Sequence, residues 1–172
     1  MNVRIAYVSS ILIAVSFSAL AAPSQIEVKA RTESDFQIQQ LLIAQRHAPI
    51  NSQFRLQEHI QNLSPDSPLR VLSTPARQRF VASLRFNEAG ITSLGYEDIV
   101  NELTYRDAHR LLSLFGAERT LEKLPQLRVE TLDDEKIQIF ARPPMEDDHI
   151  GYACTGRSTC SASSQQICMT GC

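Results

Sequence analysis

The sequence lacks the short motifs by which many catalytic sites are recognised. It contains no H-E-x-x-H metal motif, no G-x-S-x-G elbow, no Walker loop and no G-x-G-x-x-G dinucleotide fingerprint. The histidines are scattered along the chain, at His47, His59, His109 and His149. We therefore expect a protein that is not an enzyme and that holds no cofactor.

An excess of charge of either sign is also absent. The chain carries 17 basic and 19 acidic side chains, which gives a formal net charge of −2. Nucleic acids and anionic membrane surfaces are bound through concentrated basic surfaces. We therefore expect a protein partner, and neither a nucleic acid nor a membrane as the ligand of the mature chain.

The longest apolar run is too short to cross a bilayer. It extends from Ile5 to Leu20 after the basic Arg4, whereas a membrane-spanning helix needs roughly 20 apolar residues. Ala19 and Ala21 are the small residues that a signal peptidase recognises, so we predict a signal peptide over 1–21. No cysteine follows the predicted cleavage site, which excludes a lipoprotein. We expect the mature protein to be periplasmic or secreted.

Helical periodicity and capping signals dominate the chain between 34 and 124. Ser34 with Gln37, and Thr104 with Asp107, have the spacing of helix caps. We predict a mainly α fold, in which 87–96 is a helix breaker followed by a short connection. The expected organisation after the signal peptide is a flexible arm (22–33), a mainly helical domain (34–142), a linker (143–150) and a cysteine-rich tail (151–172).

The strongest helix signal also predicts the centre of the core. The stripe of the helix that Thr104 caps includes Leu111 and Phe115, and Gly116 follows where a helix-ending glycine belongs. We expect Leu111 and Phe115 to be buried together, facing Phe80 and Leu84.

A change of pattern after Pro125 predicts a C-terminal β-hairpin packed on the helices. Apolar and polar residues alternate in two runs, Leu127, Val129 and Thr131, and Ile137, Ile139 and Ala141. The acidic run 133–135 lies between them and is interpreted as a solvated turn. The second acidic run, 146–148, is interpreted as a solvated linker.

All four cysteines lie in the tail, spaced C-x5-C-x7-C-x3-C. In an exported protein such clustered cysteines are typical of disulfides. We predict two disulfides among Cys154, Cys160, Cys168 and Cys172, formed within the tail and independent of the helical core. Three connectivities are open. Four thiolates could instead bind zinc or Cu(I), although we expect no metal.

The leading functional hypothesis is an exported, non-enzymatic interaction protein that presents its disulfide-bonded tail or a helical groove to a protein partner. The alternative is a precursor or carrier whose tail is a bioactive or metal-binding peptide. Serine and threonine beside the cysteines, as at Ser158, Thr159 and Ser161, resemble the cores of ribosomally made, cross-linked peptides.

Overall fold

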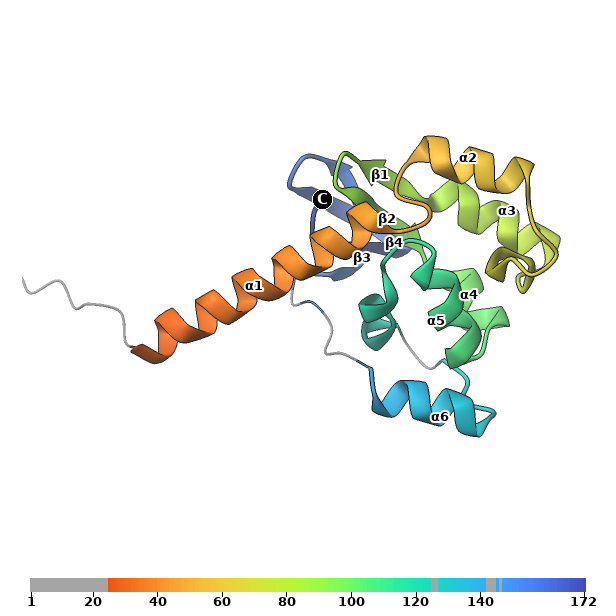
Figure 1. Ribbon diagram of the computed structural model, residues 1–172. Helices are drawn as coiled ribbons and strands as arrows, with labels where there is room; N and C mark the ends of the chain where they lie inside the picture. Colours follow the sequence, from red (N-terminus) through yellow and green to blue (C-terminus); the bar gives the residue numbers. More distant parts are fainter. Residues whose placement is uncertain (1–24, 125–126, 142–144, 146) are drawn as a thin grey trace, which may run out of the picture.

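The protein combines helices with an antiparallel sheet. The computed structural model describes residues 25–124, 127–141, 145 and 147–172; the predicted signal peptide lies outside them. A 4-stranded antiparallel sheet has the order β1-β2-β4-β3 (Figure 1). The prediction of a mainly α fold is therefore wrong, and the fold is α+β.

The helices follow the chain in two groups separated by the first two strands. The elements are α1 (Gln25–His47), α2 (Gln53–Gln61), the 3-10 helix η1 (Pro68–Arg70), α3 (Thr74–Ser83), β1 (Arg85–Asn87), β2 (Gly90–Gly95), α4 (Glu97–Glu102), α5 (Tyr105–Ser113), the 3-10 helix η2 (Glu118–Lys123), α6 (Leu132–Ile139), β3 (His149–Gly156) and β4 (Thr159–Cys168). Helix α1 begins at Gln25 rather than at Ser34, and its N-terminal half projects away from the rest of the molecule (Figure 1).

The stretch predicted as a breaker and a connection forms the first hairpin of the sheet. Phe86 pairs with Ile91, and Asn87 pairs with Gly90. Gly90 has φ 131°, and a Cβ there would lie 2.9 Å from the Cβ of Gln45, so the turn requires glycine. Strand β2 was missed because nearly all of its residues are buried. It therefore shows no alternation of apolar and polar side chains.

The β-hairpin predicted between 127 and 141 is wrong, because that stretch contains helix α6. Thr131 is the N-cap residue, and its side chain accepts a hydrogen bond from the backbone N–H of Asp134. Asp134 accepts one from the Thr131 backbone in return, which completes a capping box. Asp133 and Asp134, which were predicted to lie in the turn of a hairpin, therefore belong to the first turn of helix α6. The C-terminal hairpin of the protein is instead β3–β4, inside the cysteine tail.

The predicted core is confirmed, but it also includes part of the tail. Leu111, Phe115, Phe80 and Leu84 are buried in one cluster, and the Phe80 and Phe115 rings meet edge to face with centroids 6.0 Å apart. Ile167 and Met169 belong to the same cluster, and β4 pairs with β2. The prediction that the tail is independent of the helical core is therefore wrong.

Among the described residues, no helix combines the length and the apolar character needed to cross a membrane.

Candidate functional site

Two disulfides cross-link the C-terminal hairpin formed by β3 and β4. Cys154 pairs with Cys172, and Cys160 pairs with Cys168, with Cα–Cα distances of 5.7 and 5.9 Å. The prediction of two disulfides among these four residues is confirmed, and the structure selects one of the three connectivities. Disulfides of this kind persist in oxidising compartments.

The hairpin folds back on itself. Cys160 and Cys168 both belong to β4, yet their Cα atoms are only 5.9 Å apart, whereas eight residues of straight strand would span roughly 26 Å. The reversal lies where the register shifts between Ile150 and Tyr152. Positive φ angles at Gly151 (82°) and Gln165 (60°) accompany it. We call residues 152–162 the hairpin tip, and residues 149–150 with 167–172 the hairpin base.

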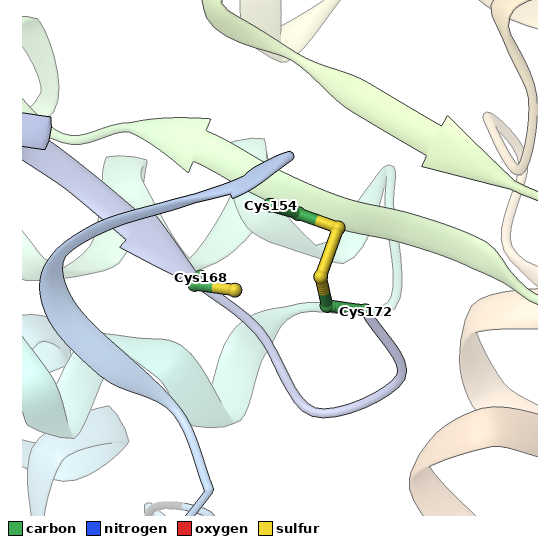
Figure 2. Close-up of side chains that lie close together, drawn as sticks. All are labelled: Cys154, Cys168 and Cys172. Atoms are coloured by element: carbon green, nitrogen blue, oxygen red, sulfur yellow. A yellow bond between two sulfur atoms is a disulfide. The ribbon is translucent and has the colours of Figure 1, made fainter. Parts of the chain in front are cut away.

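Each disulfide joins the hairpin tip to the hairpin base. Cys154 and Cys160 lie opposite each other in the tip, while Cys168 and Cys172 belong to the base. The Sγ atoms of Cys154, Cys168 and Cys172 lie within 4.8 Å of one another (Figure 2). All four cysteines are disulfide-bonded, so this arrangement places two disulfides side by side and presents no thiolate to a metal ion.

An open cavity of about 1050 Å³ lies beside the hairpin, and we call it the disulfide cavity. Cys154, Cys160 and Cys172 line it, but Cys168 does not. Its charged lining comprises Arg46, Arg85 and Arg157 with Glu88 and Asp147. Among the side chains of this lining, the arginines therefore outnumber the carboxylates by one.

His149, which the sequence places five residues before Cys154, also lines the disulfide cavity. Its ring meets that of Tyr152 edge to face, with centroids 6.2 Å apart. A Cys–His catalytic pair requires a free thiol, and the structure has none at these cysteines.

A second cavity, of about 500 Å³, lies among α1, α5, η2 and α6, and we call it the helical groove. The apolar part of its lining includes Leu41 and Ala44 of α1 and Ile137 and Phe140 at α6. The polar part comprises Gln40, Tyr105, His109, Glu118, Arg119 and Lys136. Pockets of this size and mixed character bind ligands or partner side chains.

Large apolar side chains remain exposed beside the helical groove. Leu132, Ile139 and Phe140 are 72%, 75% and 82% exposed. On α1, Phe36 and Ile43 are 57% and 51% exposed. Exposed apolar side chains on the helices that form a groove are typical of an interaction surface.

Gly116 brings α1 against the end of α5 at the helical groove. It has φ 66°, and a Cβ at this position would lie 2.8 Å from the backbone oxygen of Ala44. A side chain there would push α1 away. The sequence predicted Gly116 as a helix-ending residue; its role in helix packing is evident only from the fold.

Tyr105 is buried beside the groove, and its hydroxyl donates a hydrogen bond to the Glu122 carboxylate. Burial, together with this hydrogen bond and the charge of Glu122, raises the pKa of Tyr105 above its usual range. The phenol therefore remains protonated at physiological pH.

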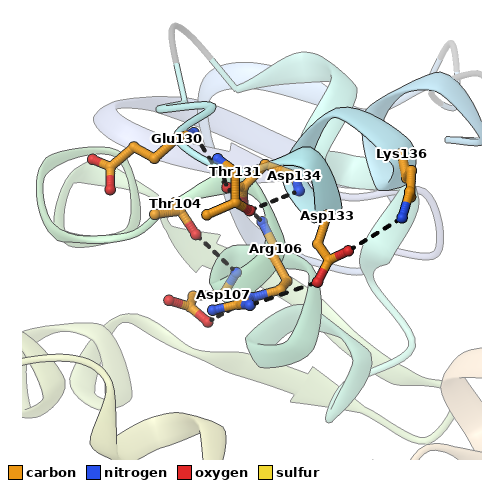
Figure 3. A network of polar contacts seen from close by, with 8 residues as sticks. All are labelled: Thr104, Arg106, Asp107, Glu130, Thr131, Asp133, Asp134 and Lys136. Carbon is orange, nitrogen blue, oxygen red and sulfur yellow. Dashed lines mark hydrogen bonds and ion pairs between the residues drawn. The ribbon is translucent and has the colours of Figure 1, made fainter.

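Asp134 holds α6 against α5 (Figure 3). Its Oδ1 accepts a hydrogen bond from the Arg106 backbone at 2.7 Å. Its Oδ2 accepts hydrogen bonds from the Thr131 hydroxyl at 2.7 Å and from the Thr131 and Glu130 backbones at 2.8 and 3.2 Å. The residue is fully buried, so the interpretation of 133–135 as a solvated turn is wrong for Asp134.

The donors around Asp134 stabilise its ionised form. Burial acts to raise the pKa of Asp134. The hydrogen bonds from Thr131, from the Arg106 backbone, from Thr104 and from the Glu130 backbone outweigh burial and hold the pKa well below its usual range. The spacing T-x-x-D in the sequence is the signal that could have revealed this residue.

Asp148 plays a similar part at the hairpin base. It is 3% exposed and accepts hydrogen bonds from the backbone and the hydroxyl of Thr170, at 2.7 and 2.9 Å. The Thr120 hydroxyl donates to its other oxygen at 3.2 Å. The interpretation of 146–148 as a solvated linker is therefore wrong for Asp148, and no local pattern distinguishes it from Asp147.

Comparison of the chain with protein-family models, with curated proteins and with solved structures finds no match.

Proposed function

We propose that the protein is an exported, non-enzymatic interaction protein whose helical groove binds an acidic, amphipathic helix of a protein partner. The observation that carries the proposal is the exposure of Phe140, which lines the groove, and of Leu132 and Ile139 on the adjoining helix α6. Apolar side chains at this density lose contact with water when a partner covers them, which favours association.

The charges of the groove favour an acidic partner. Arg119 and Lys136 line it together with a single carboxylate, Glu118. His109 is half-buried in the same lining. Complementary charge raises the association rate and disfavours wrong partners.

The shape of the site favours a helix as the bound element. The groove has helical walls, and its apolar lining comes from α1 on one side and α6 on the other. An amphipathic helix can place side chains at i, i+3, i+4 and i+7 into such a groove. The two disulfides support export to an oxidising compartment.

Two observations support an interaction role over the other hypotheses. The Tyr105 phenol beside the groove is already hydrogen-bonded to Glu122 and has a raised pKa, which makes it a poor general base at neutral pH. Release of the tail as a peptide would remove β4 from the sheet and Ile167 from the core. We therefore do not retain the precursor hypothesis.

The proposal is tested by selecting ligands from a library of displayed helical peptides against the mature protein. We expect enrichment of peptides with apolar residues at helical spacing and with several acidic residues. Phe140→Asp should weaken the selected peptides at least tenfold, whereas Phe54→Asp, on α2 and 66% exposed, should leave binding unchanged.

A charge exchange tests the acidic preference. Lys136→Glu should weaken an acidic peptide, and a peptide with lysine in place of its acidic residues should recover part of the affinity. The matched control is Arg55→Glu, because Arg55 and Lys136 each form an exposed i, i+3 ion pair on a helix. Selected peptides that bind the wild type and both Phe140→Asp and Lys136→Glu equally well would exclude the groove as the binding site.

A further inference from the structure

We propose that the two disulfides form a single thiol-exchange site. A thiolate that enters the disulfide cavity converts the pairing Cys154–Cys172 and Cys160–Cys168 into Cys154–Cys160 and Cys168–Cys172. The reactant is the thiolate of a small thiol or of a thiol oxidoreductase. This inference concerns a different surface from the helical groove and does not depend on the proposed function.

Each new disulfide would join two cysteines that the fold already places near each other. The Sγ of Cys172 lies within 4.8 Å of the Sγ of Cys168, although these two residues belong to different disulfides. Cys154 and Cys160 are likewise in different disulfides and face each other in the register of the tip. Each new bond therefore joins neighbouring residues. Side chains opposite each other on antiparallel strands have Cβ atoms about 4.5–5.5 Å apart.

The cavity determines where the reaction begins. Both cysteines of the Cys154–Cys172 disulfide line the disulfide cavity, whereas Cys168 is fully buried. Arg46, Arg85 and Arg157 line the same cavity against two carboxylates. The guanidinium groups of the arginines favour the approach of an anionic thiolate and stabilise the thiolate that leaves. We therefore assign Cys154–Cys172 as the disulfide attacked first, and we write the pathway for attack at the Sγ atom of Cys154.

The exchange proceeds in three balanced steps. The entering thiolate forms a mixed disulfide with Cys154, the Cys154–Cys172 bond breaks, and Cys172 leaves as a thiolate. The Cys172 thiolate then attacks Cys168, forming Cys168–Cys172 and releasing the Cys160 thiolate. Finally, Cys160 attacks Cys154 in the mixed disulfide, forming Cys154–Cys160 and releasing the entering thiolate. No electrons are gained or lost overall, because the thiolate is regenerated.

The product differs from the starting pairing in one mechanical respect. Both original disulfides join the hairpin tip to the hairpin base. In the product, one disulfide lies within the tip and the other lies within the base. The tip then loses both disulfide links to the base, while β4 can still pair with β2 through Ile167 and Cys168. The exchange thus releases the tip and widens the disulfide cavity.

The test maps the disulfides of the mature protein after incubation with a glutathione redox buffer at mildly alkaline pH, followed by acid quenching and thiol blocking. Cleavage after Arg157 and after Met145 and Met169 divides residues 146–172 into 146–157, 158–169 and 170–172. The original pairing links 146–157 to 170–172 and leaves 158–169 separate with its internal disulfide. The exchanged pairing links all three pieces into one species.

We expect the three-piece species to appear without an increase in free thiols. Fragmentation between Cys160 and Cys168 must then show Cys160 bonded to Cys154 and Cys168 bonded to Cys172. Tryptic cleavage after Arg157 in the folded protein should become at least several-fold faster, because the tip is released.

The Cys160→Ser/Cys168→Ser variant is the matched control. It retains the Cys154–Cys172 disulfide but has no second disulfide with which to exchange. It should accumulate the mixed disulfide with glutathione and form no new internal bond. In the wild type, retention of the original two-piece pattern while free thiols accumulate would overturn the proposal. Formation of Cys154–Cys168 and Cys160–Cys172 instead would overturn the assigned pathway.

Discussion

Helix α6 and the hairpin tip are both held against the rest of the protein, but by different chemistry. The N-terminus of α6 is fastened by one buried carboxylate, Asp134, which accepts hydrogen bonds from two segments of the chain. The hairpin tip is fastened by two covalent bonds. The Asp134 carboxylate stabilises the native state, and this stabilisation is lost when the carboxylate is protonated. A disulfide stabilises the protein largely by restricting the unfolded chain, and it is broken only when a thiol attacks it.

The difference predicts that acid loosens α6 and that thiols loosen the hairpin tip. Both regions lie beside a candidate site, the helical groove and the disulfide cavity respectively. The two sites should therefore respond to separate changes in the surroundings.

The largest effect should follow from removing the buried carboxylate. Asp134→Ala leaves the partly buried backbone donors of Arg106 and Thr131 without their acceptor. We expect the free energy of unfolding to fall by about 3–5 kcal/mol, since each orphaned donor costs about 1–3 kcal/mol. Urea unfolding followed by circular dichroism measures the loss. The matched control is Asp133→Ala, whose side chain is 61% exposed and which should change stability by less than about 0.5 kcal/mol. Equal effects of the two substitutions would contradict the fastening role of Asp134.

Removal of one disulfide should have the next largest effect. Cys154→Ser/Cys172→Ser opens a link between residues separated by 18 positions, and chain entropy predicts a loss of about 3 kcal/mol. Because β4 pairs with β2, we expect the loss to appear in the unfolding of the whole domain rather than of the tail alone. Differential scanning calorimetry, with and without reductant, measures it. An unchanged melting temperature of the domain would instead support a tail that is independent of the helical core, in contradiction to the pairing of β4 with β2.

Acidification should weaken the α6 region by a smaller amount. The pKa of Asp134 is lower in the folded than in the unfolded protein, so its contribution is present above the unfolded value and is lost as pH falls below about 4. The melting temperature of the wild type should fall over this range more steeply than that of Asp134→Asn. Parallel pH dependences of the two proteins would show that another group dominates. The hairpin disulfides should remain intact throughout.

The smallest effect should come from removing a single donor to the carboxylate. Thr131→Ala deletes the hydroxyl that donates to Asp134 and caps α6, and should cost about 1 kcal/mol. Thermal melting measures this change. A loss of stability as large as that of Asp134→Ala would mean that removal of the Thr131 hydroxyl disrupts all the hydrogen bonds to Asp134 together.

The elements predicted correctly from the sequence were ones set by local signals, although the local capping signal of α6, Thr131 with Asp134, was present and overlooked. Thr104 caps α5 as its spacing with Asp107 indicated, and Phe115 lies in the core against Phe80. Strand β2 depends on a partner strand more than 70 residues away, as the pairing of Ser93 with Cys168 illustrates. Local sequence cannot reveal such a partner. The mainly α prediction failed for this reason.

The candidate sites also combine features that the local sequence predicted with features that only the fold reveals. Clustering of four cysteines predicted disulfides, because that inference needs only residue type and compartment. Their pairing depends on the reversal of β4, which brings Cys168 next to Cys160. The helical groove combines α1 residues such as Leu41 with Ile137 and Phe140 at α6. No spacing within the chain indicates that these segments meet.

The pairing of Cys154 with Cys172 also has a consequence for biosynthesis. A chain that emerges from the ribosome or from an export channel does so from its N-terminus, so Cys154, Cys160 and Cys168 arrive before Cys172. At about 5–20 residues per second, the 18 positions from Cys154 to Cys172 take roughly 1–4 seconds to appear. Disulfide formation takes seconds to hours, depending on the oxidant. A fast oxidant can therefore join Cys154 to its hairpin neighbour Cys160 before Cys172 arrives, whereas a slow one acts on the complete set. The timing of oxidation relative to emergence thus determines which connectivity a newly made molecule acquires first.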